Sequence, residues 1–329
     1  MEDETQNQNT EDFPPVKPPK KDYLLAASVL ISALILAGAW VYTERLKIDD
    51  NARKISLAPE GVQKSALEEK VLPTEGVILP VRWGDLGAQL VSAGAIDEEK
   101  FKSLYDQRGQ FTEEYEKLLL GNNDGKLKIT EDNAGYLLNL FWALGLANNN
   151  PILISGEMSN KQYGGAGNFA STGGWILASG SPMEHYSRHE FFNLTSEQQA
   201  LVDTVSRGIY RPCCDNSTHF PDCNHGMAML GLLELMASQG ASEEEMYKAA
   251  LAVNSYWFPD TYITIAAYMK NKGVEWGDVN PQEILGINYS SASGYQRIAA
   301  QVTEPQQQRG GSGCGVEAEP QRQQGGCGV

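Results

Sequence analysis

The sequence predicts a mainly α-helical fold, with one N-terminal transmembrane helix followed by an all-helical globular domain that carries a glycine-rich loop. Three observations lead to this prediction. An uncharged apolar run of twenty residues lies near the N-terminus, and signals for the start of a helix recur along the rest of the chain. The alternation of apolar and polar residues that is typical of strands is rare, and VILPV and GWILA are the only strand candidates.

The N-terminal region predicts a membrane anchor. Residues 1–22 are acidic and then proline-rich, so we expect a disordered cytoplasmic tail with too little apolar surface to fold. Residues 23–42, YLLAASVLISALILAGAWVY, carry no charge and would span ~30 Å as a helix, the thickness of the hydrocarbon core. Tyrosine and tryptophan at its ends are typical of membrane interfaces. We expect a single-pass protein with its bulk outside the cytoplasm; the alternative is a signal peptide cleaved after Ala39.

The rest of the chain divides into three parts. Residues 43–75 are charged and lightly apolar, which favours a stalk or linker that is helical in part. The globular, extracytoplasmic domain is predicted to run from 76 to 300. Residues 301–329 are rich in glycine and glutamine, and we expect a disordered tail with two exposed thiols, Cys314 and Cys327.

Composition excludes several classes of function. The formal net charge of −16 argues against nucleic acid as a partner, because binding to phosphates requires a basic surface. Five cysteines are too few for a disulfide framework in a chain of 329 residues, and their odd number leaves at least one outside any internal disulfide. Neither G-x-S-x-G nor H-E-x-x-H occurs, so the sequence favours a binding role over catalysis.

Side chains that can cap a helix mark the helices of the globular domain. Such a side chain accepts a hydrogen bond from a backbone N–H that the helix itself leaves without a partner. Gly121 and Gly240 are expected to end two of these helices. The predicted starts are Asp97, Thr112, Thr130, Thr195 with Gln198, either Asp222 or Asn224, Ser242 with Glu245, and Asn280 before Pro281.

Two segments are predicted to form loops or turns. Residues 164–181, GGAGNFASTGGWILASGS, contain six glycines and lack the phosphate-binding pattern G-x-x-x-x-G-K-[ST]. We expect a tightly turned loop that lines the functional site. Residues 121–132 resemble a calcium-binding EF-hand loop, but Leu120 occupies the first ligand position, so we interpret them as a turn followed by a helix cap.

A cluster of cysteines and histidines in residues 210–229 predicts a metal site. Thiolates and imidazoles are ligands of soft and borderline metals, and copper(I) or zinc fits this set best. The spacing matches no standard zinc pattern, so the prediction depends on ligand density. The predicted ligands are Cys213, Cys214, Cys223 and His225, with His219 as a fifth candidate. Upstream, His185 and His189 would share one face of a helix and form a second, weaker candidate pair.

The same cysteines allow two other functions. Cys223 precedes an apolar helix, whose positive end lowers the pKa of a thiol, so a thiol–disulfide redox protein is one alternative. A structural or interaction module, with the cluster as a disulfide staple, is the other. If the protein binds a metal, the tail thiols Cys314 and Cys327 would be a mobile arm that meets a metal donor or acceptor. If it is a redox protein, the same arm would meet a thiol partner.

Residues 210–256 contain a further pattern. It consists of Pro212, Cys213, Cys214, His219, Asp222 and Cys223, followed by a small-residue helix, the turn from Gly240 to Glu245 and a final helix ending near Tyr256. In this pattern the segment resembles the bacterial PCYCGC-motif proteins, which are exported and attached to the membrane. The chain departs from them in lacking the full Cys-x-Cys-x-Cys run and a second Cys-x-x-Cys. The resemblance implies metal handling at a bacterial cell membrane, and the rest of the chain is similar to uncharacterised membrane-anchored bacterial proteins.

Overall fold

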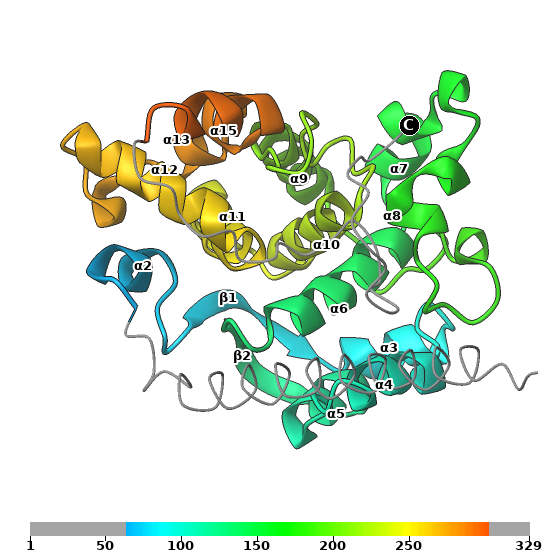
Figure 1. The fold of residues 1–329 in the computed structure, drawn as a ribbon. Helices are drawn as coiled ribbons and strands as arrows, with labels where there is room; N and C mark the ends of the chain where they lie inside the picture. Colours follow the sequence, from blue (N-terminus) through cyan, green and yellow to red (C-terminus); the bar gives the residue numbers. More distant parts are fainter. Residues whose placement is uncertain (1–63, 303–329) are drawn as a thin grey trace, which may run out of the picture. The chain divides into compact units, whose positions relative to one another are not determined.

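The computed structural model describes residues 64–302. The predicted tail, the predicted membrane span at residues 23–42, most of the predicted stalk and nearly all of the C-terminal tail lie outside these residues. In the part of the chain that the structure describes, no helix combines the length and the apolar character needed to cross a membrane. That part is mainly helical, as the sequence predicted, with one small antiparallel sheet (Figure 1).

The α-helices and strands are connected by loops and 3₁₀ turns. They follow one another in the order α2 (Ala66–Val71), β1 (Val77–Gly84), α3 (Leu86–Ser92), α4 (Glu98–Asp106), α5 (Glu113–Leu120), β2 (Asn123–Ile129), α6 (Ala134–Ala147), α7 (Pro151–Ser155), α8 (Ala170–Gly173), α9 (Ser196–Gly208), α10 (Asn224–Ser238), α11 (Glu243–Trp257), α12 (Pro259–Asn271), α13 (Pro281–Leu285), α14 (Ile287–Ser290) and α15 (Ala292–Ala299).

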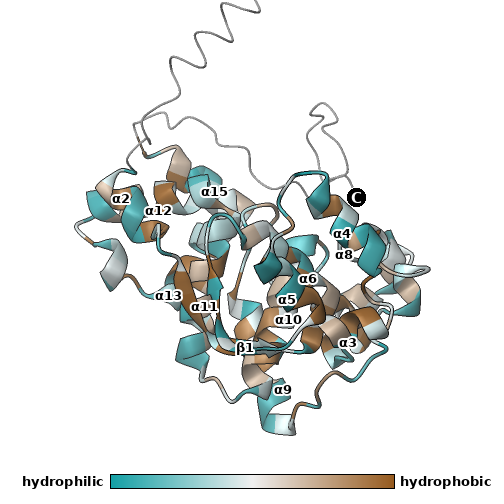
Figure 2. Cartoon of the chain, turned by 90° about the horizontal axis from the view of Figure 1, so that it is seen from below, coloured by the Kyte–Doolittle hydropathy of each residue, from teal (hydrophilic) through white to brown (hydrophobic). Residues whose placement is uncertain are grey.

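Two helices, α6 and α10, form the centre of the core and lie side by side in the middle of Figure 1. Nearly every residue of both helices is buried and most are apolar, which is typical of helices in the centre of a core. Their backbones touch at two glycines. A Cβ atom on Gly145 would lie 2.1 Å from the carbonyl oxygen of Met227, and one on Gly231 would lie 2.4 Å from that of Phe141. In Figure 2, hydrophobic residues gather on α10 and α11, while hydrophilic residues mark peripheral helices such as α2.

The described residues include the end of the predicted stalk, from Lys64 onward. The helix α2 lies within the predicted stalk, and it packs against α12. Val71 and Leu72 at its C-terminal end are buried, which ties this segment to the core. The Lys64 ammonium adds a hydrogen bond to the carbonyl oxygen of Leu72 (2.7 Å) and an ion pair with Glu131 (2.9 Å).

The two strands correct the predicted strand content. VILPV lies in β1, as predicted, and β1 pairs with β2, with Val77 opposite Ile129. The strand β2 was interpreted as a turn and helix cap, and that interpretation was wrong. Leu127 and Ile129 are buried between exposed lysines, a short alternation hidden by the turn residues before it. GWILA is not a strand, because Trp175 turns inward and donates a hydrogen bond to the carbonyl oxygen of Ala95 (2.8 Å).

Most predicted helix starts are confirmed. The side chains of Asp97, Thr112 and Asn280 accept the expected backbone hydrogen bonds, and complete capping boxes form at Thr195 and Ser242.

Two of the predicted caps are wrong. The helix α6 begins at Ala134, and Thr130 instead exchanges hydrogen bonds with Asn133 in the preceding turn, at 2.8 and 3.3 Å. At α10 neither Asp222 nor Asn224 is the cap. Cys223 occupies that position, and its side chain makes no capping hydrogen bond.

A buried carboxyl group connects α10 to the end of α6. Glu234 is fully buried, and its two oxygens accept hydrogen bonds from Asn148 (2.9 Å) and Asn150 (2.6 Å). Asn150 in turn exchanges hydrogen bonds with Gln199 on α9. Burial raises the pKa of Glu234 well above its usual value, although the two amide donors oppose this rise.

We expect the free energy of unfolding to fall as the pH rises above about 4.5. The folded protein keeps the Glu234 proton where the unfolded chain releases it, so the folded state loses relative stability up to its raised pKa. The slope contributed by one such group is at most about 1.4 kcal/mol per pH unit. Urea unfolding of the wild type and of Glu234→Gln between pH 5 and pH 9 measures this slope, as the difference between the two proteins. Equal slopes in the two proteins would contradict this assignment.

Candidate metal centre

The cysteine segment, residues 210–225, consists of a loop between α9 and α10 that folds back on itself and the first two residues of α10. An isolated antiparallel bridge joins Tyr210 to Ser217. The start of α15 clamps the loop from outside: the backbone N–H of Ala292 donates to the carbonyl oxygen of Cys214 (2.9 Å), and that of Ser293 donates to the Asp215 carboxylate (2.8 Å). The cysteines are therefore held by backbone contacts on two sides.

The loop brings the three predicted cysteines together. The sulfur of Cys213 lies 3.6 Å from that of Cys223 and 4.0 Å from that of Cys214. A disulfide bond is only ~2.05 Å long, so these are neighbouring thiols. Two thiolates bound to one metal at about 2.3 Å lie about 3.8 Å apart in a tetrahedral site. The sulfurs already have the spacing that a shared metal ion requires.

Two groups of potential ligands share Cys223. In the inner group, ligand atoms of Cys213, Cys223 and His225 lie within 4.8 Å of one another. The outer group joins Cys214, Asp222 and Cys223 within the same limit. Asp222 was not among the predicted ligands. These groups are close enough to hold a metal ion, and Cys223 is central to both.

His225 is buried without a hydrogen-bonding partner. Its side chain is fully enclosed, and neither ring nitrogen has a partner among the described residues. The ring packs against Phe258 and Trp257, with centroid separations of 4.4 and 5.8 Å. A buried polar group of this kind costs about 1–3 kcal/mol. Coordination of a metal ion would give one of its nitrogens a partner.

Other buried polar atoms without partners surround the same loop. The backbone N–H of Ser171 donates to the carbonyl oxygen of Asp222, and the Asn254 side chain donates to that of Tyr210. Such groups often indicate a bound ion, bound water or a functional site. Besides His225, the buried side-chain atoms without a partner in residues 64–302 are the Ser171 and Thr172 hydroxyls, Arg211 Nε, the Thr218 hydroxyl and Asn254 Oδ1.

The glycine-rich loop packs against this segment, as expected. The aromatic ring of Phe169 meets that of Phe220 edge to face at 5.4 Å, in addition to the backbone bond from Ser171. Gly164 and Gly165 adopt positive φ angles of 77° and 115°, which glycine tolerates best. The tight turn at these glycines leads into the short helix α8 beside the cysteines.

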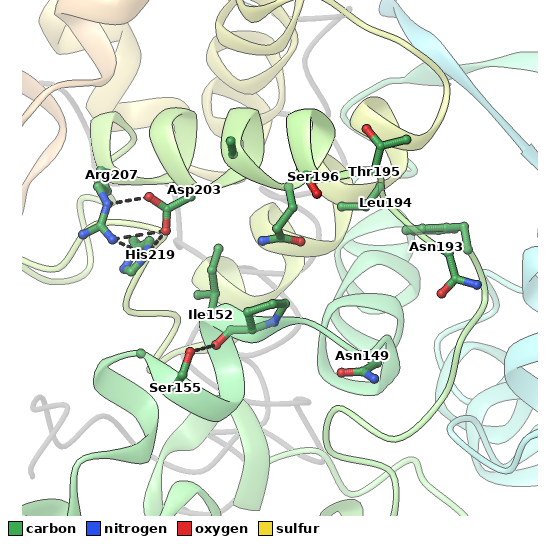
Figure 3. A pocket seen from close by; sticks show the side chains of 15 residues that line it. Asn149, Ile152, Ser155, Asn193, Leu194, Thr195, Ser196, Asp203, Arg207 and His219 are labelled. Atoms are coloured by element: carbon green, nitrogen blue, oxygen red, sulfur yellow. Dashed lines mark hydrogen bonds and ion pairs between the residues drawn. The ribbon is translucent and has the colours of Figure 1, made fainter.

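The structure places His219 away from the cysteine sulfurs, in a separate pocket (Figure 3). Its Nε2 lies 2.7 Å from the Asp203 carboxylate and 2.8 Å from the Arg207 guanidinium, both on α9. This pocket has a volume of about 750 Å³ and is lined mainly by polar side chains. The predicted fifth ligand therefore belongs to neither group of potential ligands. The short spacing between His219 and the cysteines did not fix the direction of its side chain.

His185 and His189 also meet each other instead of joining the cluster. They do not share a helix face, because the only helical segment there is a short 3₁₀ turn that ends at Glu184. Their rings stack with centroids 5.3 Å apart, and Nδ1 of His185 lies 3.1 Å from Nε2 of His189. Burial, with a smaller contribution from His185, lowers the pKa of His189. Neither histidine belongs to a group of potential ligands among the described residues.

Sequence analysis missed Arg211, which is fully buried beside the cysteines. Its guanidinium donates to Asp222 Oδ1 (2.5 Å), to the sulfur of Cys214 (3.3 Å) and to the carbonyl oxygen of Ser217 (2.7 Å). A Cβ atom on Gly226 would lie 2.7 Å from Arg211 Cζ, so glycine makes room for it. The signal in the sequence was a basic residue next to the thiols, in YRPCC.

The environment of the cluster favours ionisation of Cys223 over that of Cys214. Hydrogen bonds from Cys213 and Cys214, together with the charge of Arg211, hold the pKa of Cys223 well below its usual value, although burial opposes this. Hydrogen bonds within the cluster and burial raise the pKa of Cys214. Cys223 is therefore the cysteine of this pair that ionises first.

Titration of the cluster should show one early ionisation. We expect Cys223 to ionise well below the ordinary thiol pKa of about 8.5, and Cys214 to ionise above it. The measurement is thiolate ultraviolet absorbance against pH, in the chain with Cys314→Ser and Cys327→Ser. Adding Cys223→Ser should remove the early step. Three cysteines that titrate together near pH 8.5 would contradict this arrangement.

No family model, no curated protein and no solved structure matches this chain. The resemblance to PCYCGC-motif proteins therefore stays a prediction.

Proposed function

We propose that this protein binds one transition-metal ion through Cys213, Cys223 and His225, and that it captures or delivers this ion from a membrane anchor formed by residues 23–42. The observation that carries the proposal is the inner group, in which two sulfurs and an imidazole nitrogen without another partner lie within 4.8 Å of one another. Thiolate and imidazole ligands suit copper(I) or zinc. The clamp by α15 supports a preformed site, because it orders the loop before any metal binds.

The proposal includes a location and a partner. The uncharged run at residues 23–42 would hold the domain at a bacterial cell membrane, on the extracytoplasmic side. A soluble or membrane-bound metal carrier would then exchange its ion with the cluster. Cys314 and Cys327, in the C-terminal tail, would offer thiols for that exchange.

A second candidate function is thiol–disulfide exchange. It is favoured by the lowered pKa of Cys223, since the thiolate is the form that attacks a disulfide. Cys213, whose sulfur lies 3.6 Å from that of Cys223, would be the resolving cysteine. In this candidate the cluster cycles between two thiols and a disulfide, and no metal is bound.

Elemental analysis distinguishes the two functions. The full chain, purified in detergent under argon without chelator or affinity metal, should contain about one equivalent of copper or zinc, with its thiols reduced. The chain with Cys314→Ser and Cys327→Ser is the control, and it should keep that metal. Absence of metal, after incubation with each ion in turn, would overturn the proposal. A Cys213–Cys223 disulfide that exchanges with added thiols would then support the redox function.

A further inference from the structure

We infer that Arg211 makes this centre selective for copper(I) over zinc, because it keeps Cys214 and Asp222 from coordinating the metal. This inference rests on the proposed function and names the ion that the site takes. Three observations support it. Arg211 already contacts Cys214 and Asp222, its guanidinium is held in one position, and three potential ligands remain for the metal ion.

The outer group of ligands is already bound to a cation. The Arg211 guanidinium contacts two of its three members, with Nη2 2.5 Å from Asp222 Oδ1 and 3.3 Å from the sulfur of Cys214. The other carboxylate oxygen of Asp222 accepts a hydrogen bond from the Asn216 amide at 2.8 Å. Both oxygens of Asp222 are therefore engaged, and a metal ion there would face a positive charge at close range.

Arg211 has no room to move aside. Its side chain is fully buried, and the guanidinium also donates to the carbonyl oxygens of Ser217 (2.7 Å) and Phe220 (3.2 Å). Gly226, in the first turn of α10, packs directly against the guanidinium carbon. Four hydrogen-bonding partners and this contact hold the guanidinium in one position, so the outer group stays occupied when a metal ion enters the cluster.

The inner group then supplies three ligands: two thiolates and one imidazole. Zinc sites built from protein ligands are almost always four-coordinate and tetrahedral, and a three-ligand zinc site normally adds water. His225 is fully enclosed and Cys223 is only 5% exposed, so solvent can reach the inner group mainly past the partly exposed Cys213. Copper(I) is selected by thiolates and is stable with three ligands. The number of ligands therefore favours copper(I).

Competition titrations test this selectivity. The full chain with Cys314→Ser and Cys327→Ser would be titrated under argon with copper(I) held by bicinchoninate, and with Zn²⁺ held by 4-(2-pyridylazo)resorcinol. Arg211→Met frees Cys214 and Asp222, and it should raise zinc affinity by about tenfold or more. The matched control is Arg207→Met, which removes an exposed arginine that pairs with Asp203 outside the cluster. That variant should leave both affinities unchanged.

Cysteine variants decide the inference even where Arg211→Met fails to fold. Cys214→Ser should leave copper(I) affinity nearly unchanged, whereas Cys213→Ser should lower it more than about 100-fold. X-ray absorption of the copper complex should give two sulfur ligands and one nitrogen ligand. Tight zinc binding that depends on Cys214 would overturn the inference but keep the proposed function. Binding of neither ion to the wild-type chain would overturn both.

Discussion

Replacing Cys223 with serine should abolish metal binding, from about one equivalent to none. Cys223 is the only residue that both groups of potential ligands share. Its neighbours also lower its pKa, which favours the thiolate form that binds metals. A serine hydroxyl keeps the shape of the side chain but does not ionise near neutral pH and is a hard ligand, so it cannot replace a thiolate toward copper(I) or zinc. Plasma mass spectrometry of the purified variant measures the loss.

The control for Cys223→Ser is Cys214→Ser, which changes a neighbouring sulfur that contacts Arg211. If the inner group binds the metal ion, Cys214→Ser should keep its copper. Circular dichroism should show the same helix content in both variants, since Cys223 makes no capping hydrogen bond to α10. A Cys223→Ser protein that folds and still holds a full equivalent of metal would disprove the proposed ligands.

Substituting Gly231 with alanine should destabilise the protein by up to roughly 2 kcal/mol. The new Cβ atom would lie 2.4 Å from the carbonyl oxygen of Phe141 and 2.6 Å from the backbone nitrogen of Gly145, so α6 and α10 would have to separate. Overpacking of this kind typically costs about 1–3 kcal/mol, and here the obstacle is backbone, which cannot rotate away. The better helix propensity of alanine returns only about 1 kcal/mol. Urea unfolding measures the difference in the free energy of unfolding between the two proteins, provided that they have the same m-value.

The chain offers a matched control for this variant. Gly135 lies on the exposed side of α6, and nothing is within 4 Å of a Cβ atom built on it. Gly135→Ala should therefore be neutral, or stabilising by about 1 kcal/mol, through helix propensity alone. If Gly231→Ala behaves like Gly135→Ala, the close approach of the two central helices is not a feature of the folded protein.

Local signals in the sequence predicted the helices well, because a capping side chain and its backbone partner lie three residues apart. Thr195 and Ser242 are examples, and both form complete capping boxes. Thr130 misled the prediction because it bonds to Asn133 in a turn of similar spacing. The strand β2 was missed because its pairing with β1 depends on residues about fifty positions away.

The candidate site was predictable only in part. Cys213 and Cys223 are close in sequence, so a short loop could bring their sulfurs together, as it does. The direction of each side chain depends on tertiary contacts that the spacing does not record. His219 turns toward Asp203 on α9, and Arg211 turns inward because Gly226 leaves space. These contacts involve residues on other segments, and they decide which ligands are available.

The clamp that α15 places on the cysteine loop sets an order of events during protein synthesis. The contact joins Cys214 to Ala292, which is made 78 residues later. At about 5–20 residues per second, the ribosome needs roughly 4–16 s to cover that interval. Throughout this time the three thiols exist on a chain that has not yet closed around them. The thiols of the growing chain are thus exposed to oxidants and to the wrong ions until α15 emerges, so the step most in need of protection is biosynthesis.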